Sequence, residues 1–406
     1  MMRVIVAQHG ARRHYAIPRL LERAGMLEAL YTDSSAYSPL GRVAAWLKPL
    51  SGGRLARLAH RVPRGVPREK VFSTDAVFWF EASRAFGSRA RSEDFEYRHW
   101  CSVLSRRMAA WGTRHGDILY NMYCENLAFV EYAKSAGLRI ATDVYINPQT
   151  KWIVAEECRR FPRWAEIYRS NDGIDAVSSA CIEKMLALSD ILICPSQWVI
   201  DGLVAFRAFD PSRVALVPDG CTLDYDGRRN QPVPGRVLFA GVDALRKGLP
   251  YLGQAATALR SRGRTYDFRV AGIEDRRVWN DPLCRDLHFL GRLTTEQMKQ
   301  EFLTADVLAL PTLSEGLAGV CTQAMAAGLP VVTTRCAGTT IQSGVDGILV
   351  PERDAAVLAE AIDECIQRRS FRQDLAEQAW AAAGYFSEEK WGQRLLPVLQ
   401  KLRGGS

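Results

Sequence analysis

Short apolar runs alternate with polar loops and amphipathic stretches along this chain, and one unit of this pattern is especially clear. Residues 307–310 form an apolar run, and a polar loop with a single acid, Glu315, follows. A stretch of helical composition covers residues 319–327, and a second apolar run begins at Val331. The order strand, glycine-rich loop, helix, strand predicts a parallel α/β unit. Its loop and its helix N-terminus should face a ligand crevice.

The same order recurs at the N-terminus, where the sequence predicts a strand over residues 3–7 and a loop that contains Gly10. A helix is expected to continue from this loop through Glu28. Further strands are predicted at 118–120, 140–144, 191–194 and 237–240. One long helix is predicted at 175–188. Apolar strands separated by helices favour an α/β fold with parallel sheets.

Composition sets the broad class of the protein. The chain has 406 residues, of which 48% are apolar and 24% charged, which is typical of a globular protein with two or three domains. The opening apolar run is too short for a signal peptide, and no apolar run reaches the roughly 20 residues of a membrane span. The ten cysteines and six histidines show no metal-ligand spacing, so no metal site is predicted. Cysteines scattered singly favour a reducing cytoplasm.

The stretch 307–347 resembles the signature of the family 4 retaining glycosyltransferases, in which two glutamates stand eight positions apart on a GT-B fold. Glu315 matches the first glutamate, and Gln323 stands at the position of the second. In the family the second acid binds the ribose hydroxyls of the donor nucleotide. A glutamine carbonyl can still accept one of those hydrogen bonds, so Gln323 is expected to alter the ribose site.

A second stretch, RVLFAGVDALRKGLPYL, resembles the segment that holds the donor diphosphate in this family. The resemblance implies that Lys247 contacts the diphosphate, and it places Val242 where an arginine is expected. Arg246, Arg12 or Arg13 could supply the missing contact. Glu315 and Lys247 are therefore the expected catalytic pair. The other expected donor-binding residues are Gly10, Gly241, Arg246, Arg292, Leu293, Gly316, Leu317, Ala318, Gly319, Val320 and Gln323.

The resemblance also implies a domain organisation. A GT-B protein has two Rossmann-like domains that face a deep interdomain cleft, here an acceptor domain over residues 1–208 and a donor domain over 209–385. An amphipathic helix over 386–406 is expected to cross back to the first domain.

The acceptor side departs from the family, because the histidine that usually follows the fourth strand is missing from that loop and from the next. Polar residues stand there instead, and they could face the sugar or the acceptor, or could be ordinary solvated loop residues. These candidates are Tyr123, Glu125, Asn126, Asp143, Tyr145 and Asn147.

The function implied by the resemblance is sugar transfer from a nucleoside-diphosphate sugar to an acceptor hydroxyl, with retention of configuration and without a metal or cofactor. The acceptor could be a lipid-linked compound, a glycan or a small molecule, and the pathway could lead to a glycan, polysaccharide or glycolipid. Two alternatives stay open. One is another GT-B enzyme, such as a nucleotide-sugar epimerase or an inverting transferase, and the other is a non-catalytic GT-B binding protein.

Charge is unevenly distributed. Residues 1–210 contain 29 basic and 22 acidic residues, and residues 41–70 contain eight basic residues and one acid. Arg54, Arg57 and Arg61 share a helical face. Such a segment could bind an anionic membrane surface or a phosphorylated acceptor, or could be a solvated surface. No nucleic-acid motif accompanies it. A cytoplasmic protein, peripheral to the inner face of the membrane, is the corresponding prediction.

Overall fold

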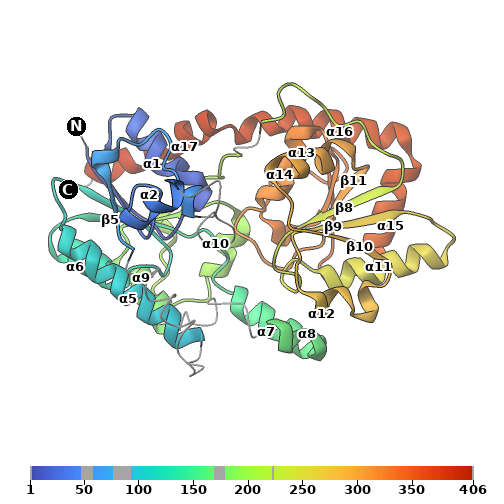
Figure 1. Cartoon of the computed structure of the whole chain (residues 1–406), viewed down its shortest axis with the longest axis horizontal. Helices are drawn as coiled ribbons and strands as arrows, with labels where there is room; N and C mark the ends of the chain where they lie inside the picture. Colours follow the sequence, from blue (N-terminus) through green and yellow to red (C-terminus); the bar gives the residue numbers. More distant parts are fainter. Residues whose placement is uncertain (1, 47–57, 76–92, 169–178, 222–223, 405–406) are drawn as a thin grey trace.

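The computed structural model describes residues 2–46, 58–75, 93–168, 179–221 and 224–404. They form two α/β domains that lie side by side, with a long helix, α17 (Glu388–Gly404), running back along one side of the molecule (Figure 1).

The first domain is built on a parallel sheet of seven strands in the order β3-β2-β1-β4-β5-β6-β7. The strands are short, and the central ones are mostly buried, as is expected when helices cover both faces of a sheet, whereas the two edge strands are only partly buried. The strands are β1 (Val4–Ala7), β2 (Leu27–Thr32), β3 (Val71–Ser73), β4 (Ile118–Met122), β5 (Arg139–Asp143), β6 (Ile191–Cys194) and β7 (Val214–Leu216). Because β7 belongs to this sheet, the first sheet extends beyond residue 208, where the sequence suggested the domain boundary.

The helices of this half connect successive strands. They are α1 (Ala16–Arg23), α2 (Pro39–Trp46), α5 (Glu93–Trp111), α6 (Leu127–Ser135), α7 (Thr150–Arg160), α8 (Pro162–Tyr168), α9 (Ser179–Leu188) and α10 (Gln197–Leu203).

The second domain contains a parallel sheet of six strands in the order β10-β9-β8-β11-β12-β13. Its strands are β8 (Arg236–Ala240), β9 (Asp267–Ala271), β10 (Leu287–Gly291), β11 (Val307–Leu310), β12 (Val331–Thr334) and β13 (Ile348–Val350). Its helices are α11 (Leu249–Ser261), α12 (Arg276–Trp279), α13 (Thr295–Thr304), α14 (Gly319–Ala327), α15 (Ala355–Gln367) and α16 (Arg369–Ala383).

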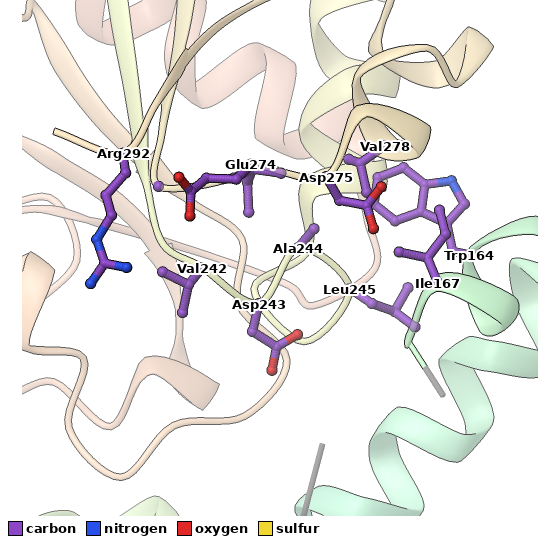
Figure 2. A pocket seen from close by; sticks show the side chains of 12 residues that line it. Trp164, Ile167, Val242, Asp243, Ala244, Leu245, Glu274, Asp275, Val278 and Arg292 are labelled. Atoms are coloured by element: carbon purple, nitrogen blue, oxygen red, sulfur yellow. The ribbon is translucent and has the colours of Figure 1, made fainter. Parts of the chain in front are cut away.

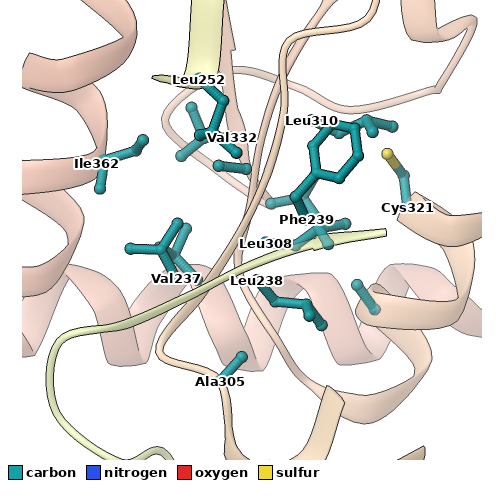
Figure 3. Close-up of a cluster of buried hydrophobic side chains, with 14 of the residues drawn as sticks. Val237, Leu238, Phe239, Leu252, Ala305, Leu308, Leu310, Cys321, Val332 and Ile362 are labelled. Carbon is teal, nitrogen blue, oxygen red and sulfur yellow. The ribbon is translucent and has the colours of Figure 1, made fainter. Parts of the chain in front are cut away.

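The core of the second domain lies where its central strands meet the flanking helices. Phe239 of β8 and Leu310 of β11 are fully buried, and Figure 3 shows them grouped with Cys321 of α14. Leu252 of α11 and Ile362 of α15 are also in this group of buried side chains (Figure 3). This packing holds the carboxyl ends of the strands, and hence the loops that follow them, in fixed positions.

The predicted helix through Glu28 is wrong. Helix α1 ends at Arg23, and Gly25, with φ of 67°, reverses the chain. Glu28 then lies in β2, which pairs in parallel with β1. The acid and its leucine neighbours fit a helix by composition, but Leu27, Ala29 and Leu30 are buried in the sheet. Tertiary burial therefore outweighs local helix preference here.

Helices from each half of the chain pack against the opposite domain. Trp391, Leu395 and Leu399 of α17 are buried in the first domain's core, and Glu388 bonds Arg19 of α1 at 2.9 and 2.5 Å. In the opposite direction, α7 and α8 follow β5 of the first sheet but pack against the second domain. Val154 of α7 and Trp164 of α8 are buried in the core of that domain. The α/β prediction with two Rossmann-like, parallel-sheet domains is confirmed, and the architecture is GT-B.

Candidate active site

Glu315 is the centre of a compact charged cluster in the loop between β11 and α14. One oxygen of its carboxylate, Oε1, lies 2.6 Å from Nζ of Lys247 and 3.0 Å from a guanidinium nitrogen of Arg246. Arg246 also donates to Asp243 at 2.6 Å and to the carbonyl of Ser314 at 2.6 Å. Two motifs that are 68 residues apart in the sequence therefore form one site.

The protonation state of Glu315 follows from this cluster. Burial by itself would raise the pKa of the carboxyl group, but the charges of Arg246 and Lys247, with their hydrogen bonds, lower that pKa to about 2. Glu315 is therefore an anion at neutral pH. It accepts hydrogen bonds and cannot serve there as a proton donor.

Glycines in this region make room for neighbouring groups of the protein. A Cβ atom on Gly241 would lie 2.1 Å from Cδ of Lys247, so only glycine lets the lysine reach Glu315. A Cβ atom on Gly316 would lie 1.9 Å from the carbonyl oxygen of Tyr145, which belongs to the first domain. The hydroxyl of Ser196, also in the first domain, donates to the carbonyl of Gly316 at 2.5 Å. Gly316 thus serves interdomain packing.

The N-terminus of α14 is open. Its first residue is Gly319, its N-cap residue Ala318 has no side-chain hydrogen bond, and beyond its chain neighbours and its own helix no described atom lies within 4 Å of a Cβ built on Gly319. Uncapped helix N-termini attract anions through free N–H groups and the helix dipole. Gln323 is one turn further along, where its backbone carbonyl accepts a bond from Tyr225 at 2.8 Å. Leu317 and Val320, partly buried, pack against the core of the second domain.

A cavity of about 670 Å³ lies beside this cluster (Figure 2). It is bounded by the loops that follow β8, β9 and β10 and by α8 of the first half. Its lining residues are Trp164, Ile167, Val242, Asp243, Ala244, Leu245, Gly272, Ile273, Glu274, Asp275, Val278 and Arg292. Arg292 and Val242 are the sequence candidates found here, whereas the next candidate along the chain, Leu293, is half-buried.

On the first domain, the ends of β1 and β4 bring several predicted acceptor residues together. Glu125 and Asn126 are fully buried, so the interpretation as solvated loop residues is wrong for both. Glu125 pairs with Arg12, and the backbone N–H of His9 donates to it at 3.1 Å. Gly10, at the same loop, has φ of 64° and its N–H donates to Asp33 at 2.8 Å.

A second buried group surrounds Asp143 at the end of β5. Asp143 pairs with Arg13 and accepts a hydrogen bond of 2.6 Å from the hydroxyl of Tyr120. Arg13 also lies 2.7 Å from Asp219, which follows β7. Burial is the largest effect on Asp219 and raises its pKa to about 6, although the charge of Arg13 acts in the opposite direction.

The remaining acceptor candidates differ in their surroundings. The ring of Tyr145 lies under the guanidinium of Arg12, 4.1 Å from the ring centroid. Tyr123 is buried among apolar side chains of the first domain. Asn147 donates to the carbonyl of Trp198 at 2.6 Å and accepts from the N–H of Gln149 at 2.7 Å, so its amide connects α7 to α10.

Arg12, Arg13 or Arg246 was expected to supply the diphosphate contact that an arginine at position 242 would make. Val242 is 78% exposed, whereas Arg12 and Arg13 are engaged with acids of the first domain and Arg246 with Asp243 and Glu315. The three arginines are thus held by carboxylates.

His9 is the residue that sequence reasoning missed. It follows β1 rather than β4, and its Nε2 lies 2.7 Å from Oδ1 of Asn126. Its ring packs edge-on against Trp100 at 4.3 Å. The structure therefore places a histidine beside the loop that was expected to carry one. The parallel order β1 next to β4 was the available signal, because their carboxyl ends share one edge of the sheet.

The basic segment 41–70 is only partly described, and Arg54 and Arg57 lie outside the described residues. Arg61 pairs with Asp33 at 3.0 Å and Lys70 with Glu22 at 2.7 Å, so part of its charge is balanced within the domain. On α2, Trp46 is 79% exposed and Val43 50%. Among the described helices, none has the length and apolar character needed to cross a bilayer.

Comparison with known proteins finds similarity to glycosyltransferases, and the family match lies in the second domain, which contains Glu315 and Lys247. The family described as glycosyl transferases group 1 matches residues 234–368, which hold the sheet of the second domain. An uncharacterized glycosyltransferase of Methanocaldococcus jannaschii is 30% identical over 151 residues, which are 35% of this chain and 38% of that protein. The amylovoran biosynthesis glycosyltransferase AmsK of Erwinia amylovora is 25% identical over 221 residues, 51% of this chain and 50% of AmsK.

A D-inositol 3-phosphate glycosyltransferase of Corynebacterium urealyticum is 25% identical over 250 residues, 55% of this chain and 59% of that enzyme. The chain thus spans 38–59% of the length of these three relatives. Over the matched residues the chain is thus similar to glycosyltransferases of the group 1 type.

Solved structures show the fold over the whole chain. Sucrose-phosphate synthase from Thermosynechococcus elongatus aligns with a TM-score of 0.70 and 16% identity and covers 100% of both chains. HepE of Anabaena, in complex with UDP and glucose, aligns with a TM-score of 0.64 and 15% identity over 99% of this chain and 100% of its own.

Proposed function

We propose that this protein transfers a sugar from a nucleoside-diphosphate sugar to an acceptor hydroxyl, with retention of configuration and without a metal. The observation that carries the proposal is the pairing of Lys247 with Glu315 at 2.6 Å, next to the uncapped N-terminus of α14. The group 1 match over the same domain supports it, and so does the presence of UDP in similar folds such as HepE.

The charges of this site suit the departure of a diphosphate. Lys247 has three N–H donors, so it can bond Glu315 and still donate to a phosphate oxygen. The open N-terminus of α14 adds backbone donors and a favourable dipole, and such preorganised groups stabilise developing negative charge. Positive charge from the protein can thus carry out the neutralisation that a metal ion performs elsewhere.

Glu315 has the complementary role in the proposal. Because it stays ionised, it can accept hydrogen bonds from sugar hydroxyls and orient the ring for attack. The acceptor hydroxyl would attack from the side of the leaving group, and the departing phosphate oxygen would take its proton. This sequence of events requires no separate carboxylate base.

The test is incubation with a panel of nucleotide sugars, first alone and then with candidate acceptors. The proposal expects slow release of one nucleoside diphosphate alone and faster release with the correct acceptor, with the product anomer identified by NMR. Inverted product would favour an inverting transferase, and an isomerised donor would favour an epimerase. A protein that binds no nucleotide would support the non-catalytic alternative, to which the exposed Val242 and the residue Gln323 lend weight.

A further inference from the structure

Two charged side chains at the mouth of the cavity have no ion-pair partner among the described residues. They are Glu274, which follows β9, and Arg292, which follows β10. Both are exposed, and in the view of Figure 2 they lie at the same end of the row of lining residues. Trp164 and Ile167 lie at the opposite end (Figure 2).

The other acids of the cavity are already neutralised. Asp243 accepts from Arg246 at 2.6 Å, and Asp275 accepts from Arg277 at 2.6 Å and caps the start of α12. Glu274 is therefore the cavity acid that is available to a ligand.

The position of the cavity relative to Lys247 identifies the part of the donor that it receives. Residues 242–245 line the cavity, and the next two residues reach Glu315. A donor whose phosphates contact Lys247 and the N-terminus of α14 would thus extend its base along this loop into the cavity. Nucleotides bind at this edge of parallel sheets, beyond the carboxyl ends of the strands.

Val242 supplies a surface for such a base. It is 78% exposed, lines the same cavity as Glu274 and Arg292, and lies near both in the view of Figure 2. An apolar side chain at this position offers a face on which a planar ring can pack, whereas an arginine would add a third charge to the same cavity. The valine at position 242, where the family has an arginine, is then part of the base site.

We propose that this cavity binds guanine, with Glu274 and Arg292 as the residues that determine base specificity; the proposal rests on the donor site described above. Guanine presents two adjacent donors, N1–H and N2–H, which match the two oxygens of a carboxylate. It also presents two adjacent acceptors, O6 and N7, which match the paired N–H groups of an arginine. The chemical class of the donor is accordingly a guanosine-diphosphate sugar.

The other bases fit this pair less well. Uracil and thymine present one N–H between two carbonyl oxygens, so a carboxylate that accepts from the N–H meets two repelling oxygens. Cytosine and adenine each present one amino group, and neither has two adjacent donors beside two adjacent acceptors. A well-formed bidentate pair discriminates between bases by about 10–100-fold in affinity.

The experiment measures dissociation constants of GDP, UDP, ADP and IDP for the full chain by calorimetry. The wild type should bind GDP at least about 10-fold more tightly than UDP or ADP. IDP lacks the 2-amino group of guanine, so it should bind more weakly than GDP. In E274Q the advantage of GDP over IDP should disappear, and R292A should reduce the GDP:UDP affinity ratio. The matched control is E296Q, at an acid of α13 that does not line the cavity, which should leave that ratio unchanged.

The outcomes separate this inference from the proposed function. Tighter binding of UDP than of GDP would overturn the guanine assignment and leave the transferase proposal standing. A GDP preference that survives in both E274Q and R292A, with folding checked by circular dichroism, would overturn the role of these residues. Failure of every nucleoside diphosphate to bind would overturn the proposed function, and the inference with it.

Discussion

Two cations hold one carboxylate at Glu315, and this arrangement means that the loop is organised before a substrate arrives. Lys247 and Arg246 both contact Oε1 of Glu315, and the backbone N–H of Glu315 donates to the carbonyl of Cys336 at 2.9 Å. A preorganised charge cluster costs little rearrangement when charge develops on a leaving group. The roles of these residues can be tested one at a time.

Replacement of Glu315 by glutamine should preserve the fold and nucleoside-diphosphate binding but lower turnover. We expect a loss of at least about 10-fold, or roughly 1.4 kcal/mol of barrier, because a neutral amide orients sugar hydroxyls less strongly. Steady-state kinetics and circular dichroism would measure the two effects. Wild-type turnover in E315Q would remove Glu315 from the reaction.

The same variant gives a prediction about pH. The pKa of Glu315 falls from an ordinary value of 4.5 to about 2 on folding, so its contribution to stability is complete above pH 4.5 and is lost as the pH falls towards 2. Across this range the free energy of unfolding of the wild type should fall by about 1.4 kcal/mol per pH unit more than that of E315Q. Urea titrations at several pH values would measure it, and parallel slopes would contradict it.

Replacement of Lys247 by alanine should weaken binding of a nucleoside diphosphate more than binding of the nucleoside. A charge-assisted hydrogen bond worth about 1.5–3 kcal/mol is expected to disappear. The control is K134A, which removes a lysine paired with Asp190 at 2.6 Å in the first domain. Equal losses for both ligands would mean that Lys247 acts through the structure of the loop.

At the scale of elements, the sequence predicts the strands and helices whose ends are marked by residues next to them in the chain. The apolar run 307–310 and the helix 319–327 correspond to β11 and α14 with the same bounds, because a proline and a glycine mark their ends. Strand β2 was missed because its burial depends on pairing with β1. The contacts of Glu315 with Lys247 and of His9 with Asn126 also depend on sheet order, which local patterns do not specify.

Helix α2 is the described element that could contact a membrane. We propose that Trp46 and Val43 enter the interface of an anionic bilayer while exposed Arg42 contacts lipid headgroups. The double variant R42E/W46S should then lose cosedimentation with anionic vesicles at low salt, since each basic residue near the surface contributes about 1 kcal/mol. Nucleotide binding should not change.

The control for this experiment is W380S, which removes an exposed tryptophan from the second domain. Vesicle binding that is equal in the wild type and R42E/W46S, or absent in the wild type, would contradict the proposal. The basic segment would then be more suited to a soluble anionic acceptor.

At the scale of the whole molecule, one buried acid connects the two domains. Glu157 of α7 is completely buried and bonds the hydroxyl of Tyr251 at 2.7 Å and Arg353 at 2.5 Å. Both partners belong to the second domain. Tyr251 is itself buried, so its hydroxyl depends on the carboxylate for its hydrogen bond, and Arg353 would lose its ion-pair partner.

The variant E157Q should therefore lower the free energy of unfolding by about 1–3 kcal/mol, because a charged hydrogen-bond network would be left incompletely satisfied. Its neighbour provides the control: Glu156 makes exposed ion pairs with Arg159 and Arg160, so E156Q should leave stability nearly unchanged. Chemical denaturation measures both, and equal effects would contradict a special role for Glu157.

The return of α17 to the first domain has a consequence for synthesis on the ribosome. The cluster around α1 and β1 includes Trp391, Leu395 and Leu399, which are made some 370 residues after Leu20. Domains generally fold as units from the N-terminal end during translation, but this domain cannot close its core in that way. Its apolar face must wait for α17, so the nascent chain carries an exposed surface that chaperones can recognise until the last helix emerges.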